Sequence, residues 1–325
     1  MKINLVVWGL GKHSANKVID IIKKTKKINL YGIYTRNQKL LKKISKKYKC
    51  NSWKSSNEML NDKKINVIYL ATPIGFHFSE GKRILLSGKH FWSEKSLACS
   101  YEQVKSLVRI AKKRNLAICE SFMFLYHPMF KKIKDLLVKK IIGSPYFVNF
   151  NFFCPHLERT NWRYKNKLGG GALLDLGCYP ISSYLNLFNL NLKIFFALLK
   201  NESSYKVDTY GLVFIKNKDT FFKLNWGFGY LYENKIKIFG SKGILEATPF
   251  YSKPFNHRPI IKIYKNNVTK KIIFSQTNHF IEMLNSFSDI INDKKKRNEQ
   301  YKICSNQSKL IDEVRKRNSF NLFNK

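Results

Sequence analysis

Acidic residues are scarce in this sequence: 21 Asp and Glu stand against 60 Lys and Arg, which gives a formal net charge of +39. Such an excess is typical of a nucleic-acid-binding protein, or of a solvated lysine-rich surface that has no polyanionic partner. The lysines are spread along all 325 residues, and we find no zinc-finger, helix-turn-helix or aromatic RNA-binding signature. We therefore favour the solvated surface, expect no nucleic-acid partner, and keep a basic nucleic-acid-binding protein as the minor alternative.

Paired cysteines and long apolar runs are also missing. None of the six cysteines has CxxC spacing, so we expect reduced thiols, no metal site and a cytoplasmic location. No apolar stretch reaches the ~18 residues of a membrane span, so we expect no membrane partner. The first apolar run leads into a glycine motif and lacks the cleavage site of a secretory signal.

The sequence does have the composition of a globular protein, with 44% hydrophobic and 25% charged residues and a length that suits two domains. Up to about residue 120, short apolar runs such as "INLVVW" (3–8), "INLYGIY" (28–34) and "INVIYLATP" (65–73) alternate with helical patterns. This alternation predicts a parallel sheet covered by helices on both faces, that is, an α/β Rossmann domain over residues 1–120.

The pattern changes after residue 120. Aromatic-rich alternating runs such as "YFVNFNFF" (146–153) and "TFFKLNWGF" (220–228) predict an α+β domain with an open, mostly antiparallel sheet over residues 121–325. A helical stretch at 278–293 leads to a polar C-terminal segment.

A glycine motif follows the first predicted strand. A glycine at position 9 allows a tight turn, and one at position 11 lets a pyrophosphate approach the backbone at the start of a helix. Ser14 takes the place of the third glycine of GxGxxG. An ordinary strand–helix turn is the alternative, but the position at the start of a strand–helix series favours dinucleotide binding. The expected contacts in this motif are Gly9, Leu10, Gly11, Lys12 and His13.

Two further strand ends contribute to the predicted cofactor site. The second strand is followed by Thr35 and Arg36, where an NAD-preferring site usually has Asp or Glu. A guanidinium suits a 2′-phosphate, so we expect NADP(H) and keep NAD(H) as the alternative. In "ATPIGFH", which ends another strand, the residues expected to line the crevice are Ala71, Thr72, Pro73 and His77.

The segment "GGGALLDLGCYP" (169–180) combines three glycines with Asp175, Tyr179 and Pro180. We interpret the glycines as a backbone that closes over a ligand, with Asp175 and Tyr179 directed at it. Pro180 suits the first turn of a helix, which would place Tyr179 near the positive helix end. A glycine-rich turn before a core helix, with a buried capping Asp, is the alternative.

With "GLGKHS", "ATPIGFH", "GKHFWSEKSLA" and "GGGALLDLGCYP" in this order, the chain resembles the glucose–fructose oxidoreductase / inositol dehydrogenase (Gfo/Idh/MocA) family over nearly its whole length. "EKS" matches the Glu-Lys-Pro of the family, with Ser96 in place of proline. The resemblance implies NAD(P) binding by residues 1–120, and substrate binding and oligomerisation by residues 121–325. It also implies Glu94 in the cofactor site, Lys95 as the active-site lysine, and Asp175 and Tyr179 in the positions of the family's Asp and His/Tyr.

The implied reaction is NAD(P)-linked oxidation or reduction of a sugar or similar carbonyl. Hydride addition to a ketone leaves negative charge on oxygen, so the site must stabilise this charge and deliver a proton. A tyrosine has a pKa near ~10, which a nearby ammonium group lowers. We therefore expect Lys95 and Tyr179 to act as a pair, with Asp175 orienting the substrate or the lysine.

Within the family, "NWRYKNKLGGGALLDLGCYPIS" is most similar to nucleotide-sugar 3-ketoreductases of deoxysugar biosynthesis. Aldose (xylose-type) and dihydrodiol dehydrogenases are alternatives, and a non-catalytic NADP-binding regulatory protein is an alternative of another class. We expect a homodimer or homotetramer. The residues expected to contact the sugar or its diphosphate are Lys95, Arg163, Tyr164, Asp175, Tyr179 and Arg258.

Overall fold

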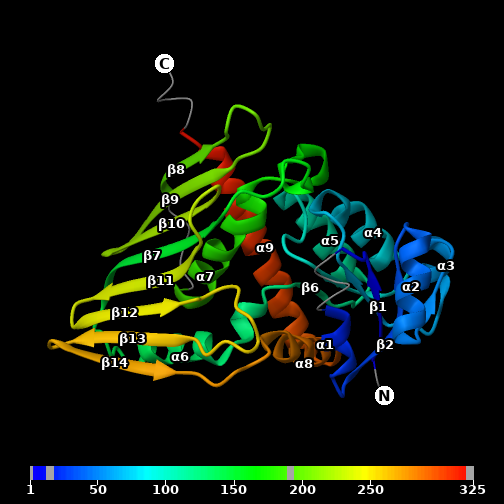
Figure 1. Cartoon of the computed structure of the whole chain (residues 1–325), viewed down its shortest axis with the longest axis horizontal. Helices are drawn as coiled ribbons and strands as arrows, with labels where there is room; N and C mark the ends of the chain where they lie inside the picture. Colours follow the sequence, from blue (N-terminus) through cyan, green and yellow to red (C-terminus); the bar gives the residue numbers. More distant parts are fainter. Residues whose placement is uncertain (1–2, 12–17, 189–193, 320–325) are drawn as a thin grey trace. The chain divides into compact units, whose positions relative to one another are not determined.

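The computed structural model describes residues 3–11, 18–188 and 194–319. The chain forms two compact units (Figure 1). Unit 1 contains Met1–Ser121 and Phe280–Ser308, and unit 2 contains Phe122–His279 and Lys309–Lys325. The structure differs from the expected division in one respect, because residues 280–308 return to the first unit.

Unit 1 is built on a six-stranded sheet in the order β3-β2-β1-β4-β5-β6, in which every pair of neighbours is parallel. This is the strand order of a Rossmann fold, and it confirms the predicted α/β class. The strands are β1 (Ile3–Trp8), β2 (Ile28–Tyr34), β3 (Asn51–Ser52), β4 (Val67–Leu70), β5 (His90–Ser93) and β6 (Ile118–Glu120).

The helices of unit 1 follow from apolar stripes and capping side chains. In α2, Leu41, Ile44 and Tyr48 are buried at helical spacing, and the Asn37 side chain caps the first turn by accepting from Leu40 N. The elements that follow the strands are α1 (Ile19–Lys23), α2 (Gln38–Tyr48), α3 (Ser56–Asn61), η2 (Ile74–Phe76), α4 (His77–Leu86) and α5 (Tyr101–Lys113).

Two C-terminal helices, α8 (His279–Asn292) and α9 (Lys294–Lys316), supply the returning residues of unit 1. The ring of Phe287 stacks on Trp92 with centroids 4.6 Å apart, and the Tyr301 hydroxyl donates to Leu116 O at 2.6 Å. The helix α9 differs from the expected polar C-terminal segment, for which no helix was predicted. Its helical stripe is hard to recognise because buried polar side chains, such as Ser308, alternate with apolar ones.

Unit 2 contains an eight-stranded sheet in the order β14-β13-β12-β11-β7-β10-β9-β8. All neighbours are antiparallel except β7 and β10, so the expectation of a mostly antiparallel sheet is confirmed. The strands are β7 (Pro145–Cys154), β8 (Ile194–Lys200), β9 (Tyr210–Asn217), β10 (Thr220–Phe228), β11 (Glu233–Gly240), β12 (Gly243–Thr248), β13 (Ile260–Lys265) and β14 (Val268–Ile273).

Short helical elements lie between and before these strands. Before β7 the chain forms η3 (Met123–Tyr126) and α6 (Pro128–Val138), and His127 accepts from Met129 N at the start of α6. Between β7 and β8 lie η4 (Trp162–Tyr164), η5 (Asn166–Leu168), the π-helical turn η6 (Leu173–Gly177) and α7 (Cys178–Phe188).

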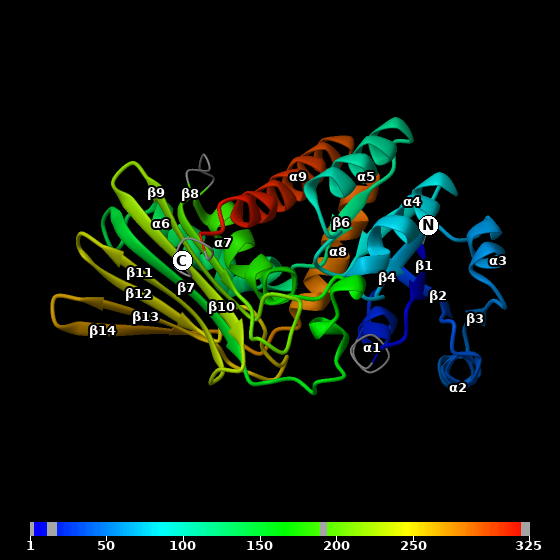
Figure 2. The ribbon, with the colours of Figure 1, turned by 90° about the horizontal axis from the view of Figure 1, so that it is seen from above.

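The two faces of the unit 2 sheet differ. Figure 2 shows α7 on one face, and ring contacts such as Tyr184 with Phe222 (4.9 Å between centroids) join α7 to the sheet. On the opposite face of this sheet, no helix from the described part of unit 2 covers the strands. Aromatic side chains such as Phe147, Phe221 and Phe239 lie there beside lysines, and Phe221 is 43% exposed.

Within the described ranges, no helix is both long enough and apolar enough to cross a bilayer.

Candidate active site

The carboxyl ends of β1 and β4 meet at the point where the strand order of unit 1 reverses, which is where open α/β sheets bind ligands. Gly9 follows β1 with a φ of +107°. A Cβ atom at Gly9 would lie only 2.7 Å from the backbone of Ala71, so the turn requires glycine. Two predicted contacts, Lys12 and His13, lie outside the described residues.

This turn fits a dinucleotide. No described atom lies within 4 Å of the place where a Cβ of Gly11 would be, so a phosphate has room beside the backbone. The hydroxyl of Thr72, at the end of β4, is buried and has no hydrogen-bond partner among the described residues. Such a donor suits an oxygen of a bound cofactor. Leu10, in contrast, is 7% exposed and packs into the core.

Thr35 and Arg36 follow β2 at the same edge of the sheet, and Arg36 is exposed. Its guanidinium lies 5.3 Å from the centroid of the Phe76 ring, a cation–π contact that orients the side chain. Asn37 caps α2 directly afterwards. The strand end therefore presents a cation and no carboxylate, as a 2′-phosphate requires.

The segment that carries Lys95 follows β5 and is held on both sides. Glu94 N donates to Leu70 O at 2.9 Å, and Leu97 N donates to Glu120 Oε1 at 2.9 Å. Burial raises the pKa of Glu120 to about 8, while the Leu97 N–H and the charge of Lys95 act against the rise. Sequence analysis missed Glu120, because a single glutamate at a strand end has no distinguishing pattern.

His77, predicted to line the cofactor crevice, is fully buried at the start of α4. Its ring nitrogens lie 2.8 Å from Thr72 O and from Ser96 O. The ring therefore bridges the ends of β4 and β5, and its cofactor contact stays a prediction. Pro73 lies beside Thr72, half-buried at the start of η2.

In unit 2, the glycines of segment 169–171 pack against the chain itself. A Cβ atom at Gly170 would lie 2.4 Å from Arg163 O, and one at Gly171 would lie 2.4 Å from Asp208 Oδ1. Gly171 also has a φ of +117°. The contacts that require glycine here are internal, whereas sequence analysis expected a backbone that closes over a ligand.

Asp208 holds the start of the helical run that contains Asp175 and Tyr179. Its side chain accepts from Leu173 N at 2.6 Å, and its backbone oxygen accepts from Ala172 N at 2.8 Å. Burial raises the pKa of Asp208 to about 6, against the effect of the Leu173 N–H and other charges. Sequence analysis missed Asp208, which is distant in sequence from the segment that it holds.

The helical run starts earlier than expected. The π-helical turn η6 leads directly into α7, so Pro180 lies inside a continuous helical run and Tyr179 is more than one turn from its beginning. The expectation that Tyr179 lies at the positive helix end is therefore wrong, and Asp175 has that position. A proline inside a helix lacks the N–H of one backbone hydrogen bond, and Pro180 lies three residues after the π turn.

Asp175 and Arg163, both predicted to contact substrate, form an ion pair. Arg163 Nε donates to Asp175 Oδ2 at 2.7 Å, and Asp175 is 6% exposed. The charge of Asp175 raises the pKa of Arg163, against the effect of burial. The Arg163 guanidinium also lies 4.8 Å from the ring centroid of Trp162. Asp175 is therefore a charge-compensated carboxylate rather than an isolated base.

Tyr179 is surrounded by aromatic rings. The centroids of Phe122, Phe152 and Tyr251 lie 5.6, 5.1 and 5.6 Å from that of Tyr179. The ring is fixed in orientation by these walls, and the Arg163 guanidinium interacts electrostatically with its hydroxyl. The structure thus brings Tyr179, Asp175 and Arg163 together within unit 2.

Asn234 positions Tyr251, one of these walls. The Asn234 side-chain oxygen accepts from Phe250 N at 2.9 Å and from Tyr251 N at 2.6 Å. Its amide nitrogen donates to Ser252 O at 2.7 Å. This buried amide fixes the loop after β12, and sequence analysis missed both Asn234 and Tyr251.

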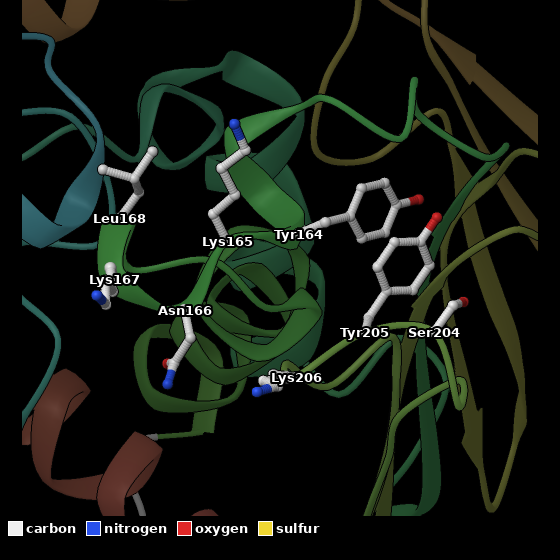
Figure 3. Close-up of a pocket in the computed structure, with 8 residues that line it drawn as sticks. All are labelled: Tyr164, Lys165, Asn166, Lys167, Leu168, Ser204, Tyr205 and Lys206. Atoms are coloured by element: carbon white, nitrogen blue, oxygen red, sulfur yellow. The ribbon is translucent and has the colours of Figure 1, made fainter.

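A pocket of about 410 Å³ lies beside the glycine segment (Figure 3). The ring of Tyr164 stacks on Tyr205 with centroids 4.0 Å apart and forms one wall. The pocket is lined by Tyr164, Lys165, Asn166, Lys167, Leu168, Ser204, Tyr205 and Lys206. Lys165, Lys167 and Lys206 make the lining basic, and Figure 3 shows their ammonium groups pointing in different directions. Arg258, the other predicted cation, is exposed in the loop before β13.

Two family models match the chain. The model of the Gfo/Idh/MocA oxidoreductase family, NAD-binding Rossmann fold, matches residues 3–122, and the Gfo/Idh/MocA C-terminal domain matches residues 130–246. Among curated proteins, a dTDP-3,4-didehydro-2,6-dideoxy-alpha-D-glucose 3-reductase of Actinomadura kijaniata is 26% identical over 258 residues, 79% of this chain and 78% of the relative. A trans-1,2-dihydrobenzene-1,2-diol dehydrogenase of Xenopus laevis is 34% identical over 135 residues, 42% of this chain and 41% of the relative.

Among solved structures, the 3-ketoreductase KijD10 of Actinomadura kijaniata in complex with NADP and TDP-benzene has a TM-score of 0.94 at 23% identity, and 98% of each chain is covered. An aldose–aldose oxidoreductase of Caulobacter crescentus complexed with glycerol has a TM-score of 0.89 at 16% identity, with 97% of each chain covered. At these identities the likeness shows the fold.

The raised pKa of Asp208 leads to a prediction for stability. The pKa of Asp208 is 3.8 in an unfolded chain and about 6 in the folded protein. Between these two pH values the folded protein therefore binds more protons at Asp208 than the unfolded chain does. As the pH rises through this range, Asp208 lowers the free energy of unfolding. Asp208→Asn keeps an acceptor for Leu173 N but does not ionise. Relative to wild type, the variant should gain about 1 to 3 kcal/mol between pH 4 and pH 7.

Urea unfolding curves at several pH values measure this difference. Asp219→Asn, at an exposed turn between β9 and β10, is the matched control and should show little pH-dependent change. A constant difference between Asp208→Asn and wild type across this range would contradict the assignment.

Proposed function

Because the chain belongs to the Gfo/Idh/MocA oxidoreductase family, we propose that it reduces the 3-keto group of a nucleotide-linked deoxysugar with NADPH. The observation that carries the proposal is the match to dTDP-sugar 3-reductases, four of which align with 79–88% of this chain at 23–26% identity. The retained lysine, tyrosine and glycine turn agree with a catalytic rather than a regulatory protein.

The separation of two residues supports the same reaction. Solved structures of KijD10 include a variant with a tyrosine replaced by phenylalanine and variants with a lysine replaced by alanine or glutamate. The two substituted residues are separated by the same number of positions as Lys95 and Tyr179. We therefore assign Lys95 and Tyr179 to the reacting site.

For the cofactor, we assign the diphosphate to the turn at Gly9 and Gly11 and the 2′-phosphate to Arg36. The room beside Gly11, the unused hydroxyl of Thr72 and the absence of a carboxylate after β2 support this assignment. KijD10 was solved with NADP bound.

The residues of this chain would provide the proton and the charge stabilisation. When bound, NADPH supplies the hydride that adds to the keto carbon. The Tyr179 hydroxyl donates its proton to the keto oxygen, which becomes the product hydroxyl, and Lys95 stabilises the negative charge that develops there. Arg163 favours the tyrosinate that remains, because a nearby positive charge stabilises a phenolate, and water then returns the proton.

The ion pair and the basic pocket suit the rest of the substrate. Arg163 holds Asp175 so that the carboxylate can accept a hydrogen bond from a sugar hydroxyl. The pocket lined by Lys165, Lys167 and Lys206 is a candidate for the nucleoside diphosphate. Oxidation of a vicinal diol is the second candidate reaction, because the relatives with 33–34% identity over part of the chain are dihydrodiol dehydrogenases.

We infer that the enzyme is cytoplasmic and forms homodimers or homotetramers through the uncovered sheet face of unit 2. None of the six cysteines forms a disulfide, in agreement with a reducing compartment. The strands β7 and β10 are neighbours at the centre of this face, and Phe147 of β7 pairs with Phe221 of β10, so two aromatic side chains adjoin in a surface of the kind that marks interfaces.

The catalytic assignment predicts that Tyr179→Phe lowers kcat by about 10²- to 10⁴-fold, because general acid catalysis contributes a factor of this size. NADPH affinity should stay within twofold. The assay follows NADPH oxidation with dTDP-linked 3-keto sugars, and a parallel assay offers dihydrodiols and xylose with NADP. The control is Tyr184→Phe on the same helix, which removes a buried hydroxyl that has no hydrogen-bond partner among the described residues and should keep nearly full activity.

Lys95→Ala should cost at least as much as Tyr179→Phe, and the double variant should be little slower than the slower single variant, because residues that act as a unit are strongly non-additive. Near-full turnover by Tyr179→Phe would show that the proton comes from another group.

The cofactor assignment predicts that Arg36→Ala weakens NADPH binding about tenfold or more, as expected for the loss of a charge-assisted hydrogen bond, and leaves NADH binding nearly unchanged. Fluorescence titration with both cofactors measures this. Arg109→Ala, at an exposed site on α5, is the control for the general loss of positive charge. An equal loss of affinity for NADPH and NADH would contradict the assignment of the 2′-phosphate to Arg36.

The assembly proposal predicts a dimer or tetramer by light scattering at micromolar concentration. Phe221→Arg should shift the population toward monomer, because it places a charge in the apolar surface. Phe255→Arg, which changes an exposed aromatic side chain in a loop, should not. A monomeric wild-type protein would refute the proposal.

A further inference from the structure

His77 has hydrogen-bond partners that set it apart from two other histidines of the chain. The nitrogen Nδ1 of His90 accepts from Ala117 N at 2.8 Å, and that of His127 accepts from Met129 N at 3.0 Å. An N–H group points at each of these nitrogens, so each must keep its lone pair and the ring can be neutral. Burial lowers the pKa of His90 to about 4 and that of His127 to about 3, in agreement with neutral rings.

Within the described part of the chain, the polar contacts of the His77 ring nitrogens are all with oxygen atoms. Its Nδ1 lies 2.8 Å from Ser96 O and 3.0 Å from the Ser93 hydroxyl oxygen, and its Nε2 lies 2.8 Å from Thr72 O. Carbonyl oxygens cannot donate. The Ser93 hydroxyl lies 2.7 Å from Glu94 O and can donate its proton there while it accepts from the ring.

A neutral imidazole has one N–H and one lone pair. In either neutral tautomer of His77, a nitrogen lone pair would therefore face a carbonyl lone pair at 2.8 Å, a repulsive contact inside a fully buried site. Only the doubly protonated ring donates to Thr72 O and to Ser96 O at the same time.

We infer that His77 is a positioning residue, which in its doubly protonated form ties the segment carrying Lys95 to the end of β4. The importance of this segment rests on the proposed function. His77 has no part in the chemistry itself, because its ring is 0% exposed and its nitrogens are occupied by backbone oxygens.

The bridge completes the support of Lys95. On its N-terminal side, Glu94 N donates to Leu70 O, and on its C-terminal side, Leu97 N donates to Glu120. The Ser96 carbonyl lies between these two anchors. Without the contact from His77, this peptide could rotate, and the Lys95 ammonium would be less well placed beside the substrate.

The surroundings of the His77 ring both raise and lower its pKa. Burial is the largest influence and lowers the pKa of His77, and the charge of Lys95 adds to this effect. The contacts with Thr72 and Ser96 and the charge of Glu94 raise it. Glu94 and Lys95, both in the segment after β5, are the charged groups that act on the ring. The two contacts of 2.8 Å with carbonyl oxygens favour the doubly protonated ring and oppose the effect of burial.

The protonation state is tested on the full-length wild-type protein, without substrate, by NMR of ¹⁵N-histidine. The spectrum of His77→Gln identifies the His77 signals. We expect two ring N–H groups and imidazolium ¹⁵N shifts for His77 at pH 7, whereas His90 should be neutral. A neutral His77 at pH 7 would overturn the inference even if the protein is an active reductase. If the proposed function fails instead, the NMR result still stands.

The positioning role is tested by the pH dependence of kcat. In wild type, kcat should fall at high pH as the ring loses a proton and one of its two contacts. His77→Gln should lower kcat at pH 7 by about tenfold, the factor expected for one hydrogen bond to a charged group, and should abolish this alkaline fall. His77→Asn serves if the glutamine variant does not fold.

The control variant is His90→Gln, which changes a buried histidine of the same unit and should keep the wild-type pH profile. NADPH affinity should stay within twofold in all of these variants. An unchanged pH profile in His77→Gln, with kcat lowered or not, would show that His77 serves the fold alone.

Discussion

The register of the parallel ladder from β2 through β1, β4 and β5 determines where the predicted cofactor residues of unit 1 lie. Trp8 pairs with Tyr34 and with Leu70, and Leu70 pairs with Ser93, so four strands end at one level. The turns that follow these strands carry the glycine motif, Arg36, Thr72 and Lys95. A shift of one residue in any of these pairings would turn the side chains of that strand to its other face and move the following turn out of line.

In unit 2, the corresponding constraint is charge compensation in a buried site. A carboxylate removed from water needs a partner, and the partner of Asp175 is Arg163, which is close enough to affect Tyr179 as well. Asp208 meets the same requirement with backbone N–H groups at the start of the helical run. The two carboxylates therefore have different roles. Asp175 positions the Arg163 guanidinium near the Tyr179 hydroxyl, and Asp208 fixes the backbone of the helical run that carries Tyr179.

The parts of the molecule that sequence patterns predicted are those governed by short-range rules. The strands β1, β2 and β10 have the predicted bounds, because the apolar patterns that define a strand act within about ten residues. Glu120, Asp208 and Asn234 could not be predicted, because each bonds to backbone that is distant in sequence. The prediction that Tyr179 lies at a helix start was wrong for a related reason. A proline usually marks the first turn of a helix, and no local sequence pattern reveals the π turn that precedes Pro180.

The return of residues 280–308 to unit 1 also bears on the synthesis of the chain. The six strands of the parallel sheet leave the ribosome before α8 and α9, and the partners of Trp92 and Leu116 are Phe287 and Tyr301. All of residues 122–279 are made in between. Domains generally fold in the order of their synthesis, yet here the packing of the first unit is complete only after residues 280–308 have emerged, and part of its apolar surface stays exposed until then.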